Sequence, residues 1–189
     1  MRVLIDDVGA RYTKPTMVRE LAQAGVPVAA FLPTRVPRLY KYANLRNHRK
    51  IMVVDGRIGF TGGMNIRAGH WRSRDPEAPV RCVHFRVNGP IVADMQEAFV
   101  TDWLFTTGEK LLNDDWFPDL KAAGDVVARA VTSGPDEDLE QIEFVALHAL
   151  SCARHSICIV TPYFLPPEAL TMALGLAAMR GIAVDILVP

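Results

Sequence analysis

The first part of the chain alternates short apolar runs with a segment of helical periodicity. Residues 2–5 are rich in branched side chains and are followed by two aspartates, which is typical of a short β-strand. Hydrophobic residues then recur at helical spacing from Met17 to Ala24, just before a glycine that suits a helix end. Residues 26–32 are continuously apolar, as in a strand buried on both faces. A strand, a helix and a strand in this order predict a parallel pair of strands.

The pattern further along predicts a hairpin, a long helix and a second strand–helix–strand unit. Residues 49–54 and 58–61 are strand-like and flank Asp55-Gly56, a strong signal for a tight hairpin turn. A long helix is expected from Pro90. One of its faces is apolar and is expected to lie in the core: Ile91, Met95, Phe99 and Trp103. The other expected elements are a strand at 80–87, a strand at 126–131, a helix ending near 154, and a unit at 156–160, 167–179 and 182–188. The sequence therefore predicts an α/β fold with a mixed sheet flanked by helices.

Composition and charge narrow the classes of partner. The 189 residues are half hydrophobic and carry no formal net charge. Because nucleic-acid-binding proteins normally show a basic excess, this neutrality counts against nucleic acid as a partner. The three cysteines show no metal-ligand spacing and are expected to be reduced, mostly buried thiols. No apolar stretch approaches the ~20 residues that span a bilayer, so any membrane contact is expected to be peripheral.

The candidate chemistry lies in the segment HRKIMVVDGRIGFTGGMN, which begins at His48 and ends at Asn65. His48 and Lys50 are two residues apart, so on a strand their side chains point to the same face. If Asp55-Gly56 form the loop, position 48 pairs with 63 and position 50 with 61. A longer turn would slide this register by one or two residues. Either register returns Asn65 to the neighbourhood of His48 and Lys50.

Phosphodiester chemistry requires the kinds of side chain that this hairpin brings together. A group with a pKa near neutrality attacks or transfers a proton, a fixed cation binds phosphoryl oxygens, and a neutral donor orients them. His48, Lys50 and Asn65 match these three roles. Gly62 and Gly63 have no Cβ and would let a phosphate approach the backbone closely. No cluster of His, Cys, Asp or Glu shows metal-ligand spacing, so no metal is expected.

The spacing H-x-K-x4-D-x6-G-G-x-N is complete here and resembles the signature of the phospholipase D superfamily. The segments NLRNHRKIMVVDG, FTGGMNI, VNGPIVADMQEAFVTDW and IVTPYFLP are similar to bacterial cardiolipin synthases in particular. The resemblance implies a phospholipase D-like fold and phosphatidyl transfer between phosphatidylglycerol-like lipids through a phosphohistidine, without metal or cofactor. One histidine attacks and a second protonates the leaving alkoxide. It also implies a peripheral place on the cytoplasmic face of the bacterial inner membrane.

Three further residues are candidates with a second interpretation. Asp55 belongs to the motif as a catalytic candidate, although a carboxylate in a hairpin turn often binds local amides. His84 either supports His48 from behind, as groups around a catalytic residue do, or is an ordinary core or surface histidine. Arg46 lies in a basic segment, 34–50, that either meets anionic headgroups or is a solvated loop. We expect Arg46 and His84 to join the two glycines in substrate binding.

Members of the family carry two such motifs, whereas this chain has one. The resemblance implies that residues 1–132 form a catalytic half-domain lacking its first strand and helix, and that 133–189 form a linker and the start of a second half. The missing second half or a homodimer mate would then complete the site. The unit at 156–188 could fill the vacant place in the sheet, in its own chain or in a neighbour's. Two alternatives stay open: a single-motif phosphodiesterase or nuclease active as a homodimer, and an inactive fragment that binds lipid headgroups.

Overall fold

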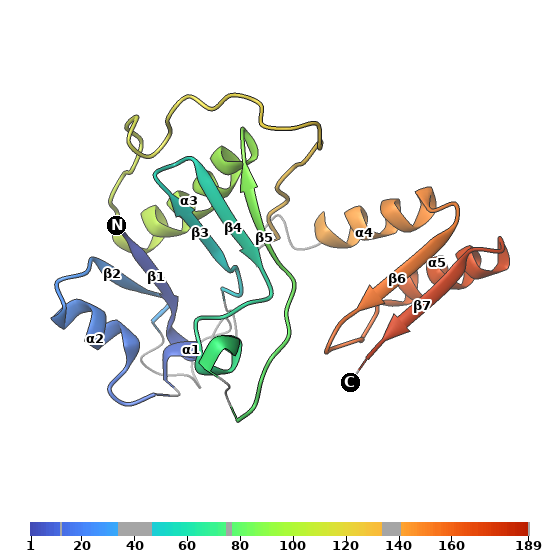
Figure 1. The fold of residues 1–189 in the computed structure, drawn as a ribbon, viewed down its shortest axis with the longest axis horizontal. Coiled ribbons are helices and arrows are strands. Elements are labelled where there is room, and N and C mark those ends of the chain that lie inside the picture. Colours follow the sequence, from blue (N-terminus) through green and yellow to red (C-terminus); the bar gives the residue numbers. More distant parts are fainter. Residues whose placement is uncertain (12, 34–46, 75–76, 134–140, 189) are drawn as a thin grey trace. The chain divides into compact units, whose positions relative to one another are not determined.

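The fold is that of a computed structural model, which describes residues 1–189 except 12, 34–46, 75–76, 134–140 and 189 (Figure 1). The chain divides into two compact units, an N-terminal unit of Met1–Ala130 and a C-terminal unit of Val131–Pro189. Both contain helices and strands, and the strand pairs are parallel in some places and antiparallel in others. The predicted α/β class is therefore confirmed.

The N-terminal unit begins with the predicted parallel pair of strands. Its elements are β1 (Val3–Asp6), α1 (Asp7–Ala10), α2 (Met17–Gln23) and β2 (Val28–Phe31). β1 and β2 are parallel, with Val3 opposite Val28. The short helix α1 was not predicted, and it forms because the Asp6 carboxylate accepts a hydrogen bond from the amide of Gly9 at 2.8 Å. All four residues of β2 are half-buried rather than buried on both faces, since the described sheet has only two strands.

A three-stranded antiparallel sheet follows, in the order β3–β4–β5. Its strands are β3 (Ile51–Val54), β4 (Ile58–Gly62) and β5 (His84–Asn88). The turn between β3 and β4 has positive φ at Asp55 (54°) and Gly56 (62°), and the amide of Arg57 donates to the carbonyl of Val54 at 3.0 Å. Positive φ at both central residues is the mark of a type I′ turn, which the Asp-Gly pair predicts.

The core of the N-terminal unit forms where α3 (Ile91–Thr107) packs against both sheets (Figure 1). Val100, Trp103 and Leu111 are buried and contact Leu4 of β1 and Ala29 of β2. The predicted apolar face of α3 is largely confirmed. Met95 and Trp103 are buried, while Ile91 and Phe99 are half-buried.

An ion pair joins the start of β1 to the segment just after α3. The Arg2 guanidinium donates two hydrogen bonds to the Glu109 carboxylate, and the indole of Trp103 donates a third at 2.8 Å. The hydrogen bonds from Arg2 and then from Trp103 hold the pKa of Glu109 down at about 2. Arg2 also lies over the rings of Trp103 and Trp116, 6.0 Å from each centroid. This cluster fixes the N-terminal strand against the core.

The C-terminal unit contains the predicted strand–helix–strand and a preceding helix. Its elements are α4 (Gln141–Cys152), β6 (Ser156–Val160), α5 (Glu168–Met179) and β7 (Ala183–Leu187). β6 and β7 are parallel. The core of the unit is formed by residues of its helices, of β6 and of the turn before β7: Leu150, Ile157, Leu174, Ala177 and Ile182. Among the described strands β6 pairs only with β7, in a sheet separate from β1–β2. That this unit fills the vacant place in the β1–β2 sheet, in its own chain or in a neighbour's, stays a prediction.

Two smaller expectations are wrong. Residues 126–131 form no strand, and Val126 and Val127 are 87% and 98% exposed. Their branched side chains favour a strand, but no neighbouring strand pairs with them among the described residues. Cys82, Cys152 and Cys158 are free thiols, as expected, but all three are exposed rather than buried. Cys152 ends α4, Cys158 lies at an exposed position of β6, and Cys82 lies in the irregular segment before β5.

Candidate active site

The candidate active site begins in the residues that lead into β3. The side chain of His48 is exposed, and that of Lys50 is half-buried. The Lys50 ammonium group donates a hydrogen bond to the carbonyl oxygen of His48 at 2.8 Å. The cation is therefore held beside the backbone of the histidine. An exposed imidazole next to a tethered ammonium group is open to an anionic phosphodiester.

Two carboxylates bind the residues on either side of His48. The amide of Asn47 donates to Asp6 Oδ1 at 3.2 Å, and its side-chain Nδ2 donates to Asp102 Oδ2 at 2.6 Å. Arg49 Nη1 lies 2.8 Å from both oxygens of Asp102. The Asp102 side chain is only 14% exposed. These contacts tie the His48 segment to α3 and to the end of β1.

The hairpin brings the end of β4 back to this segment. In the observed register Ile51 lies opposite Thr61, one residue away from the predicted pairing, because Arg57 joins Asp55 and Gly56 in the loop. The predicted allowance for a longer turn covers this shift. Continuing the register by one residue places position 50 opposite 62, and by three places 48 opposite 64. The next residue, Asn65, is exposed.

Gly62 is required by the neighbouring strand. It lies opposite His84 in the β4–β5 pair and has a φ of +147°. A Cβ there would lie 2.5 Å from the carbonyl oxygen of Val83 and 2.8 Å from Nδ1 of His84. The amide of Gly63 already donates to that Val83 carbonyl at 3.0 Å. Gly62 thus has a packing reason of its own, whereas a Cβ on Gly63 would make only an ordinary contact at 3.5 Å. Contact of either glycine with a phosphate stays a prediction.

His84 lies on the strand next to the motif hairpin and is half-buried. Its Nδ1 is buried and has no hydrogen-bond partner among the described residues. Gly62 pairs with His84 on one side and lies opposite position 50 in the continued register on the other side. The end of β4 therefore separates His84 from Lys50. His84 therefore lies opposite Gly62, and its predicted roles in supporting His48 and in substrate binding stay predictions.

The structure does not bring Asp55 to the other motif residues. It is exposed in the turn at the far end of β3. At ~3.3 Å per residue, its Cα lies about 16 Å along the strand from that of Lys50. This position fits the structural interpretation of Asp55, in which the residue terminates the strand and forms the turn. Arg46 lies outside the described residues.

Sequence reasoning missed several residues around the motif. Asn47, Asp6 and Asp102 form the anchor described above, and the pattern that could have revealed it is the pair of polar residues flanking His48. Cys82 was expected only to be a reduced, buried thiol. Its Sγ lies 3.1 Å from Nε2 of His70, and a Cβ on Gly63 would lie 3.5 Å from that sulfur.

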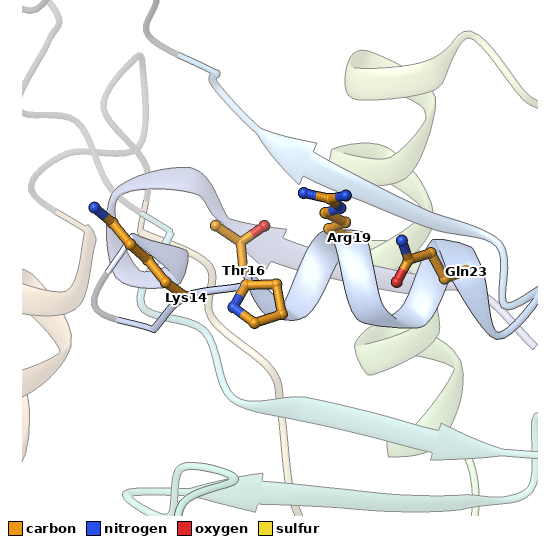
Figure 2. A pocket seen from close by; sticks show the side chains of 5 residues that line it. Lys14, Thr16, Arg19 and Gln23 are labelled. Carbon is orange, nitrogen blue, oxygen red and sulfur yellow. The ribbon is translucent and has the colours of Figure 1, made fainter.

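An open depression lies elsewhere on the N-terminal unit, beside α2. Figure 2 shows Arg19 and Gln23 projecting from α2 and Lys14 from the turn before it; the lining residues are Lys14, Pro15, Thr16, Arg19 and Gln23. None of the motif residues lines it. Within the described part of the chain, no three His, Cys, Asp or Glu side chains gather closely enough to hold a metal ion. No described helix is both long and apolar enough to cross a membrane.

Comparison with known proteins identifies close similarity along the whole chain. The family model described as "Cardiolipin synthase, PLD-like domain" matches residues 1–103. A cardiolipin synthase of Oceanobacillus iheyensis is 39% identical over 199 aligned positions, which cover all of this chain. A cardiolipin synthase of Staphylococcus aureus and a cardiolipin synthase 2 of Staphylococcus epidermidis are each 34% identical, again over all of this chain. The chain spans 39% of the length of each of these relatives.

Proposed function

Since this chain belongs to the family of cardiolipin synthase PLD-like domains, we propose that it supplies one half of the active site of a phosphatidyl-transferring enzyme. The proposed substrate is a phosphatidylglycerol-like lipid and the proposed product is diphosphatidylglycerol. The observation that carries the proposal is the arrangement of the hairpin, with His48 and Lys50 just before β3 and Gly62 at the end of β4 that pairs with the start of β3. The relatives are named cardiolipin synthases, which supports this choice of substrate.

In the proposed reaction, His48 is the covalent or the acid–base residue. If it attacks, an imidazole nitrogen forms a bond to phosphorus while the bond to the leaving alkoxide breaks, and a second histidine protonates that alkoxide. The hydroxyl of the acceptor lipid then displaces the imidazole and gives its proton to the second histidine. Lys50 and Asn65 would bind the non-bridging phosphoryl oxygens. No step requires a metal or a cofactor.

The second histidine must come from outside the motif of this chain. His70 and His84 lie near the hairpin, but neither is followed two residues later by lysine. We propose that a second motif, in the remainder of a longer chain or in a homodimer mate, completes the site. The length of the relatives supports the first option.

We further propose that the enzyme works at the surface of the bacterial inner membrane, on the cytoplasmic side, because its lipid substrates are found there. Exposed apolar residues in the C-terminal unit support a peripheral contact: Tyr163 is 84% and Leu165 is 92% exposed. A basic segment next to the motif, which includes Arg46, would attract anionic headgroups.

The test uses the purified gene product that contains this chain, with vesicles of phosphatidylglycerol. Formation of diphosphatidylglycerol and release of glycerol are measured together. We expect His48→Ala to lower both by about 10³-fold or more. The control is His155→Ala, an exposed histidine of the C-terminal unit, which should keep its activity. Equal activity of the two variants would overturn the assignment of His48.

A second experiment distinguishes a site completed by the remainder of a longer chain from a site completed by a homodimer mate. The 189-residue chain alone is assayed for hydrolysis of a chromogenic phosphodiester while its mass is followed by analytical ultracentrifugation. The proposal expects no turnover by the monomer. Turnover that appears only with a dimer would favour the homodimeric phosphodiesterase instead.

A further inference from the structure

We propose that Asp102 of α3 is a positioning residue, which fixes the backbone on both sides of His48 and so aims its imidazole and the Lys50 ammonium group at the phosphodiester. This inference rests on the proposed function, because it assigns Asp102 a part in the same reaction. Asp102 lies outside the motif and more than fifty positions after Arg49 in the sequence.

The first observation is that one carboxylate binds both sequence neighbours of His48. Asp102 Oδ2 accepts a hydrogen bond from Nδ2 of Asn47 at 2.6 Å, and both its oxygens lie 2.8 Å from Nη1 of Arg49. Asn47 Oδ1 in turn accepts from the amide of Arg49 at 3.0 Å. The backbone of residues 47–49 is thus closed into a small hydrogen-bonded loop around the histidine.

The second observation concerns exposure. The side chains of Asn47 and Arg49 both reach Asp102 of α3, whereas the side chain of His48 between them is exposed. The contact with α3 therefore holds the two neighbours and leaves the histidine accessible.

The third observation is that Asp102 is itself held rigidly. It lies between Val100 and Trp103, which are 5% and 4% exposed in the core of the N-terminal unit. Its carbonyl accepts a hydrogen bond from the Thr106 hydroxyl at 2.7 Å. Side chains presented from a packed helix hold a catalytic group more accurately than loop residues do. Asp6 adds an independent bond to the amide of Asn47 from the other side.

The experiment compares Asp102→Ala and Asp102→Asn with Glu97→Gln, an exposed carboxylate on the same helix. Single-turnover rate constants are measured in the gene product, with saturating enzyme in excess over a chromogenic phosphodiester. Under these conditions the rate constant does not depend on the fraction of folded enzyme, so lost stability alone would not change it. Thermal unfolding is recorded in parallel.

We expect Asp102→Ala to lower the single-turnover rate constant by about 10- to 100-fold, the effect of displacing a reacting group by about 1 Å. Asp102→Asn should lower it less, because an amide oxygen still accepts from Arg49. Glu97→Gln should match the wild type. In the Asn47→Ala background the effect of Asp102→Ala should shrink, since the two residues act through one contact.

Two results would overturn the inference. An unchanged rate constant in Asp102→Ala, with only a lower midpoint of thermal unfolding, would make Asp102 a purely structural residue while leaving the proposed function intact. If turnover by the wild-type gene product does not depend on His48, the proposed function is overturned. The role of Asp102 in that reaction is then overturned as well.

Discussion

Gly62 faces His84 across the β4–β5 pair so closely that no side chain fits between them. A Cβ on Gly62 would lie 2.8 Å from Nδ1 of the imidazole, and the φ of +147° at this position favours glycine. The motif glycine therefore sets how near the neighbouring strand comes to the candidate site.

We expect Gly62→Ala to lower the free energy of unfolding by about 1–3 kcal/mol from backbone strain alone. The matched control is Gly63→Ala, where a Cβ would lie in ordinary contact at 3.5 Å from Cys82, and the change should stay within about 0.5 kcal/mol. Urea unfolding measures both variants. Equal destabilisation at the two positions would show that β5 does not impose the glycine.

Asp55→Asn should change turnover by less than about threefold, because the residue lies in the turn about 16 Å along β3 from Lys50. Asparagine tolerates the positive φ of this position, so the turn should also survive. The assay is diphosphatidylglycerol formation beside His48→Ala. A loss as large as that of His48→Ala would instead give Asp55 a catalytic part.

The Arg2–Glu109 pair should make the stability of the folded state depend on pH in the acidic range. Hydrogen bonds from Arg2 and Trp103 lower the pKa of Glu109 from its usual 4.5 to about 2. A carboxylate whose pKa is lower in the folded state stabilises that state above pH 4.5, and its contribution is lost as the pH falls towards 2. The midpoint of thermal unfolding of the wild type should exceed that of Glu109→Gln by a constant amount above pH 4.5, and the gap should close on acidification. A gap that persists at pH 2 would contradict this origin of the stability.

Activity should not depend on a divalent metal, because the proposed reaction uses imidazole, ammonium and amide groups. We expect equal rates of lipid transfer with and without a strong chelator, after removal of adventitious ions. The measurement is diphosphatidylglycerol formation by the gene product in metal-free buffer. Loss of turnover that an added metal ion restores would show that the reaction needs one.

Local patterns predicted most elements correctly because they depend on neighbouring residues. The parallel pair β1–β2, the type I′ turn at Asp55-Gly56 and the strand–helix–strand unit all follow from such signals. Residues 126–131 failed because a strand also requires a partner, which short-range pattern does not reveal. The prediction that the cysteines are mostly buried failed for the same reason, since burial is decided by distant parts of the chain.

The same division holds for the candidate site. His48, Lys50 and Asn65 could be predicted as candidates because their spacing along the chain carries the signal. Asp102 was missed because its contact with Asn47 joins residues 55 positions apart. The spacing within a motif shows which residues a hairpin brings together. Residues that contact the motif from a distant helix are brought there by tertiary packing, which the spacing does not show.

Because Asp55 lies in the hairpin turn, the motif spacing between Lys50 and Asp55 fixes the length of the strand between them. The residues between Lys50 and Asp55 are those of β3, so the spacing states how long this strand must be. One inserted residue would reverse the face taken by every side chain between the insertion and the turn. It would set Lys50 on the wrong side of the sheet or break the pairing of Ile51 with Thr61. Insertions should therefore be rejected within β3 even though none of its four residues touches the substrate in the proposed reaction, and tolerated in the exposed irregular segment at 126–129.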